Sequence, residues 1–145
     1  MSSHPPCQSV APGAARLYAC PMRPVLAALL LALPATAQSF DPDGPFRPGE
    51  SFGAPATCDT LGDWIDRAPD TGGRVSMTVD GAITASEFDG ALAYLVMCPA
   101  GGVQVMCVTY DPRAPSPEVV RFAGGYVRVG DRQVMLDPCL VYPVD

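Results

Sequence analysis

The sequence predicts an α+β domain with a small antiparallel sheet of about five strands, two helices packed on one face, and two disulfides. Two stretches carry apolar side chains at helical spacing, and the C-terminal third is rich in short β-branched runs separated by Gly and Pro. Four cysteines lie between residues 58 and 139. The order of elements, helix, strand, helix and then four strands, is typical of α+β domains.

The first predicted helix covers residues 60–68. Thr60 precedes it as a capping residue, and Pro69 ends it. Its buried stripe comprises Leu61, Trp64, Ile65 and Ala68. Residues 74–79 then alternate apolar and polar side chains, which predicts a half-buried strand that ends at Asp80–Gly81.

The second predicted helix covers residues 85–97. Its stripe is Phe88, Leu92, Leu95 and Val96, at positions i, i+4, i+7 and i+8. Beyond it, residues 103–110 read as a central strand and residues 111–117, with three prolines, as a loop. Three short strands follow at 119–122, 126–129 and 133–136, and the last two are predicted to form a hairpin.

The N-terminal part has the pattern of an export signal. Arg23 precedes the nine-residue apolar run 25–33, and Ala35 and Ala37 flank Thr36 as in a signal-peptidase site. The run is too short to span a membrane. We therefore expect a signal peptide at 22–37, cleavage between Ala37 and Gln38, and a periplasmic or extracellular product with no membrane span. Residues 1–21 are expected to be a misannotated leader.

Cleavage removes 37 of the 145 residues and leaves 108, divided into a Pro/Gly-rich arm at 38–56 and a disulfide-stapled domain at 57–145. The arm spaces Phe40, Phe46 and Phe52 six residues apart. It is either an extended segment that lays aromatic side chains on the domain or a flexible leader.

Composition excludes several kinds of chemistry. The chain has no Lys, and its only His, His4, lies in the leader. The mature part then has seven Arg against 15 acidic residues, a net charge of −8, which argues against nucleic-acid binding. Catalytic triads, Cys–His pairs, Schiff-base lysines and His-ligated zinc are excluded within it.

The cysteines of the mature part predict two structural disulfides. Cys58, Cys98, Cys107 and Cys139 are an even number without a C-x-x-C spacing, and they allow three connectivities. The spacing favours long-range pairings over a Cys98–Cys107 bond. An alternative is that Met97–Cys98 and Met106–Cys107 supply soft ligands for Cu(I).

One segment, residues 76–87, resembles the second half of an EF-hand calcium loop. Asp80 and Glu87 are the carboxylates of that pattern, with Gly81 at the sharp turn. Ser76, Thr78 and Ile83 take its other positions. The resemblance implies a degenerate calcium site with Asp80 and Glu87 as ligands. An Asp-Gly turn followed by a Thr84–Glu87 capping box generates the same similarity without calcium.

These observations favour an exported, acidic, non-enzymatic binding domain without a cofactor, whose partner is an unknown protein or small ligand of the cell envelope. Calcium binding at residues 76–87 is the first alternative. A carboxylate-based hydrolase using Glu87, Glu118 or Asp137 is the second.

Overall fold

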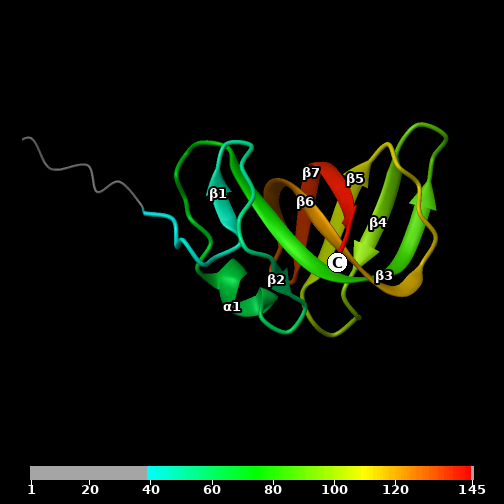
Figure 1. The fold of residues 1–145 in the computed structure, drawn as a ribbon, viewed down its shortest axis with the longest axis horizontal. Helices are drawn as coiled ribbons and strands as arrows, with labels where there is room; N and C mark the ends of the chain where they lie inside the picture. The colour runs from blue at the N-terminus through cyan, green and yellow to red at the C-terminus, as the bar shows by residue number, and fades with distance from the viewer. Residues whose placement is uncertain (1–38, 145) are drawn as a thin grey trace, which may run out of the picture. The chain divides into compact units, whose positions relative to one another are not determined.

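The computed structural model describes residues 39–144, where five strands close into a barrel (Figure 1). These are β3 (Val75–Phe88), β4 (Ala93–Met97), β5 (Gln104–Thr109), β6 (Ser116–Gly130) and β7 (Gln133–Pro143). They pair in the order β3-β4-β5-β7-β6, and β6 returns to β3. Every pair is antiparallel except β5–β7, which is parallel. The predicted α+β fold, an antiparallel sheet with two helices on one face, is therefore wrong: the chain is nearly all sheet, with a single short helix.

The second predicted helix, 85–97, is instead the end of β3, a turn and strand β4. The Asp89 carboxylate accepts hydrogen bonds from the backbone N–H groups of Ala91 and Leu92, both at 2.8 Å, and Gly90 adopts a φ of +101°. After this turn, every second side chain of β4 enters the core, namely Ala93, Leu95 and Met97. The apolar spacing that resembled a helix thus comes from a hairpin whose turn falls inside the counted stretch.

Strand β6 is also longer than predicted, because residues 124 and 125 continue the strand instead of turning it. At this point the ladder with β7 is irregular, between Gly124 and Tyr126. A Cβ built on Gly124 would lie 2.9 Å from the Cα of Cys139 on β7. The two glycines are therefore required by the close approach of two backbones. The predicted pairing of the last two strands is confirmed.

The N-terminal segment is attached to the barrel. Strand β1 (Phe46–Pro48) pairs antiparallel with β3, and β2 (Ala56–Thr57) pairs parallel with it. Phe46 is buried and packs edge-to-face on Tyr126, with ring centroids 5.1 Å apart. Strands β1 and β2 thus pair this part of the chain with the barrel.

Helix α1 (Leu61–Asp66) occupies the position of the first predicted helix but is shorter. Leu61 and Ile65 are buried, as the predicted stripe requires. Trp64 is half-buried, and the Arg67 guanidinium stacks on it, 4.3 Å from the ring centroid.

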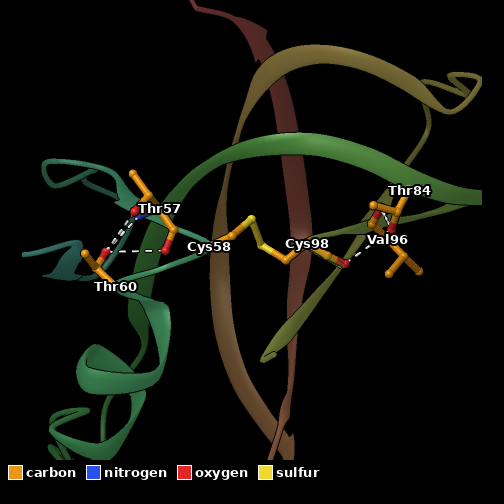
Figure 2. The surroundings of a disulfide bond; sticks show 6 residues. All are labelled: Thr57, Cys58, Thr60, Thr84, Val96 and Cys98. Carbon is orange, nitrogen blue, oxygen red and sulfur yellow. Dashed lines mark hydrogen bonds between the residues drawn. A yellow bond between two sulfur atoms is a disulfide. The ribbon is translucent and has the colours of Figure 1, made fainter. Parts of the chain in front are cut away.

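Both predicted disulfides are present. Cys58–Cys98 joins the segment before α1 to the end of β4 (Figure 2), and Cys107–Cys139 joins β5 to β7. The sequence separations are 40 and 32 residues, so both bonds are long-range, as the spacing favours.

The predicted leader and signal segment lie outside the described residues. Within residues 39–144, no helix is long and apolar enough to cross a membrane.

Candidate functional site

The structure does not assemble the EF-hand-like loop. Residues 76–87 lie within strand β3, which places Asp80 and Glu87 about 20 Å apart along the chain. Both carboxylate oxygens of Asp80 accept hydrogen bonds from Arg121 on β6, from Nε at 2.7 Å and from Nη2 at 2.8 Å. Glu87 is exposed opposite Tyr94 of β4. Within residues 39–144, no three His, Cys, Asp or Glu side chains gather in a geometry that suits a metal ion.

The other two positions that suggested a turn and a helix cap have different roles. A Cβ on Gly81 would lie 2.8 Å from Met97 Cγ and 2.9 Å from Cys58 Sγ, so this glycine admits close packing beneath the disulfide. Thr84 lies at an irregularity of the β3–β4 ladder, and its hydroxyl reaches the carbonyl oxygens of Val96 and Cys98 at 3.2 and 3.3 Å (Figure 2). Neither residue begins a helix.

The copper-type ligands are not brought together either. Cys98 and Cys107 belong to different disulfides, so neither offers a thiolate. Met97 is fully buried in the core, whereas Met106 lies half-buried on the outer face of β5.

The three carboxylates considered for hydrolysis are all exposed. Asp137 lines two surface grooves, but neither Glu87 nor Glu118 lines them with it. Glycoside hydrolysis needs two carboxyl groups flanking one bond, and these three are not brought together in either groove.

The structure instead shows a gap in the pairing between β5 and β7. Their parallel ladder ends at Cys107 and Leu136. Beyond it, β5 continues along β4 to Thr109, and β7 continues along β6 to Pro143. A groove of about 550 Å³ lies where the two strands separate, and we call it the β5–β7 slot. It is lined by Leu92, Val108, Thr109, Tyr110, Asp111, Asp137, Pro138, Cys139 and Leu140.

Large apolar side chains at the slot remain exposed. Tyr110 is 82% exposed and Leu140 is 50% exposed, and Tyr142, two residues further along β7, is 39% exposed. Single exposed apolar residues are common on protein surfaces, but several gathered around one groove indicate an interaction surface.

The outer face beside the slot is apolar as well. Val96, Met106, Met135 and Val127 are register partners on β4, β5, β7 and β6, so they form one row across four strands. All four are half-buried or exposed. An outward row of this kind departs from the polar outer face that alternation normally gives a sheet.

Carboxylates lie in the slot lining and around the hydroxyl of Tyr94 on β4. The Tyr94 hydroxyl donates a hydrogen bond to Asp89 Oδ2 at 3.1 Å. The pKa of Tyr94 is raised above its ordinary value of 10.0, chiefly by this bond, and the charges of Glu87 and Asp137 add to the shift. Asp111 lines the slot and forms an ion pair with Arg113 at 2.8 Å. We call Glu87, Asp89, Asp111 and Asp137 the acidic rim.

The slot could not be predicted while the last strand was expected to end at Leu136. The signal was present: after Pro138, residues 139–142 continue as an uninterrupted apolar run that suits a strand. Of the slot residues, only Asp137 and the disulfide cysteine Cys139 were candidates beforehand.

No protein-family model, curated protein or solved structure matches this chain. A closed five-stranded barrel is an architecture that proteins of different function share. Shared architecture does not establish function, so any function has to be argued from the site.

Proposed function

We propose that this protein is an exported, non-enzymatic binding domain that holds a basic, partly apolar polypeptide segment in the β5–β7 slot. The observation that carries the proposal is the combination of exposed apolar side chains, Tyr110 and Leu140, with carboxylates on both sides of one groove, Asp111 and Asp137. Apolar anchors within a charged rim are the usual composition of a protein-binding surface.

The charge of the rim selects a basic partner. Asp111 and Asp137 line the slot, and the charges of Asp89, Glu87 and Asp137 act on the Tyr94 hydroxyl. Arg113 is paired with Asp111. The mature chain carries a net charge of −8, which adds a long-range attraction for cations and opposes phosphate-bearing ligands.

The expected export is consistent with a binding domain that acts on an exposed polypeptide. Two disulfides are compatible with an oxidising compartment, and the predicted signal at 22–37 would place the domain in the periplasm or outside the cell. A protein partner exposed in that compartment is the expected ligand.

A labelled hexapeptide of alternating Arg and Val tests the proposal by fluorescence anisotropy. Binding is expected to weaken as salt is raised, because the rim charges are solvent-exposed. The double variant Asp111→Asn with Asp137→Asn should lose about 0.5 kcal/mol per charge, or about five-fold in Kd. The control Asp63→Asn with Asp131→Asn changes the net charge equally at exposed positions outside the slot lining.

Equal losses in the two double variants would show that only net charge matters and would refute a site at the slot. A matching peptide of alternating Glu and Val should not bind. Equal affinity for the acidic and basic peptides would refute the role of the rim.

A further inference from the structure

Strand β7 has a stretch with a pairing partner on one edge only. From Gln133 to Leu136 it lies between β5 and β6, and at Cys139 a disulfide still holds it to Cys107 of β5, with the two Cα atoms 5.3 Å apart. From 140 to 143 it pairs with β6 alone, so its second edge is unpaired there, beginning at Leu140 in the lining of the β5–β7 slot. Backbone N–H and C=O groups along such an edge form a template for another strand.

The sequence limits where a further strand can pair. Cys139 is held against Cys107 of β5 and Pro143 has no N–H to donate, so the usable edge comprises residues 140–142. Within it, Leu140 and Tyr142 remain exposed, while Val141 is half-buried against the core. The edge thus offers backbone groups together with two apolar side chains for the alternate residues of an incoming segment.

We propose that the partner segment binds as an added β-strand on the edge of β7 at residues 140–142, an inference that rests on the proposed function. It takes the position beside β7 that β5 occupies as far as Cys139. Its apolar side chains lie on Leu140 and Tyr142, and its basic side chains reach Asp111 and Asp137 in the slot lining.

The charge of the rim decides between the possible occupants of this edge. A second copy of the chain would bring its own Asp137 and its own excess of acidic residues to the same surface, and like charges oppose that pairing. A basic segment neutralises the rim instead.

Backbone methylation of the peptide tests strand addition without altering the protein. In a strand, alternate residues direct their N–H groups to the same edge. Two versions of the Arg–Val hexapeptide, N-methylated at the odd or at the even residues, keep all side chains and charges. We expect one version to bind like the parent and the other to bind at least tenfold more weakly. Equal affinities for the two versions, whether retained or lost, would overturn strand addition.

Binding of the unmodified peptide separates this inference from the proposed function. If the unmodified peptide binds and the two methylated versions behave alike, strand addition fails and the proposed function stands. If the unmodified peptide does not bind at all, the proposed function itself fails.

Substitutions in the protein supply an independent test. Leu140→Lys should weaken the basic peptide at least tenfold, while Val129→Lys, at a similarly exposed apolar residue outside the slot lining, should not. Sedimentation of both variants and the parent chain tests whether a second copy of the chain occupies the edge instead. A concentration-dependent dimer that Leu140→Lys abolishes would overturn the inference, because a second copy would then occupy the edge.

Discussion

Replacement of Gly124 by Ala is the sharpest test of how β6 and β7 meet. The added Cβ would lie 2.9 Å from Cys139 Cα and would also contact the carbonyl group of Pro138. These are backbone atoms that no side-chain rotation can move away. Overpacking of this kind costs typically 1–3 kcal/mol, and a backbone contact should place Gly124→Ala at the upper end, about 3 kcal/mol. For a domain of about 100 residues this corresponds to a fall in Tm of about 12 °C or more.

A matched control comes from the only helix of the described chain. A Cβ on Gly62 of α1 meets nothing within 4 Å, and Gly62 is not among the glycines with positive φ. Gly62→Ala should therefore stabilise the fold by roughly 0.5–1 kcal/mol. Denaturant unfolding followed by the fluorescence of Trp64, the single tryptophan, measures both variants with the disulfides intact.

The two glycine variants must move in opposite directions for the reasoning to hold. If Gly124→Ala were neutral or stabilising, the close approach of β6 to residues 138–139 would be refuted. Residues 124–125 would then be the surface turn that the sequence pattern suggests.

Three further outcomes follow from single contacts. Asp89→Ala should bring the pKa of Tyr94 down toward 10.0, measured by tyrosinate absorbance. The pKa of Asp89 is itself lowered by hydrogen bonds from the backbone N–H groups of Leu92 and Ala91. The Asp89 carboxylate should therefore stabilise the fold above about pH 4, and this stabilisation should vanish as the pH falls through the folded pKa of Asp89. Removing the disulfide that closes the 40-residue loop should cost about 4 kcal/mol in thermal or denaturant unfolding, and a loss below about 1 kcal/mol would contradict the chain-entropy argument. Asp80→Asn and Arg121→Gln should show a coupling energy of about 1 kcal/mol in a double-mutant cycle. Because Arg121 occupies both carboxylate oxygens of Asp80, millimolar calcium should leave the Tm unchanged; a calcium-dependent rise in Tm that Asp80→Asn abolishes would instead support calcium binding at residues 76–87.

The sequence predicted those elements whose pattern is local. Leu61 and Ile65 sit on one face of α1, and the alternating run at 74–79 begins β3. The cysteine count predicted two disulfides, and the spacing favoured the long-range pairings that are observed. Each of these depends on residues near one another in the chain or on counting alone.

The hairpin that contains β4 and the closure of the barrel depend on contacts that the local apolar pattern does not encode. Leu95 and Val96 look like neighbours on a helix stripe, but in β4 they lie on opposite faces, and only Asp89–Gly90 marked the turn before them. Barrel closure requires β5 to pair in parallel with β7, across more than 20 intervening residues that include all of β6. No short-range periodicity specifies such a pairing, so the sheet was predicted as open and antiparallel.

The same two glycines connect the fold to the candidate site. Gly124 and Gly125 lie against residues 137–139 of β7, and β7 leaves β5 immediately before that point, after Leu136. Because neither glycine has a side chain, β6 can approach β7 closely at the point where the ladder between β5 and β7 ends. The Cys107–Cys139 disulfide, which joins β5 to β7 at the same level, limits how far the strands separate. A pair of residues that resembles an ordinary turn in the sequence therefore lies against the segment of β7 that lines the slot, where we propose that a partner segment binds.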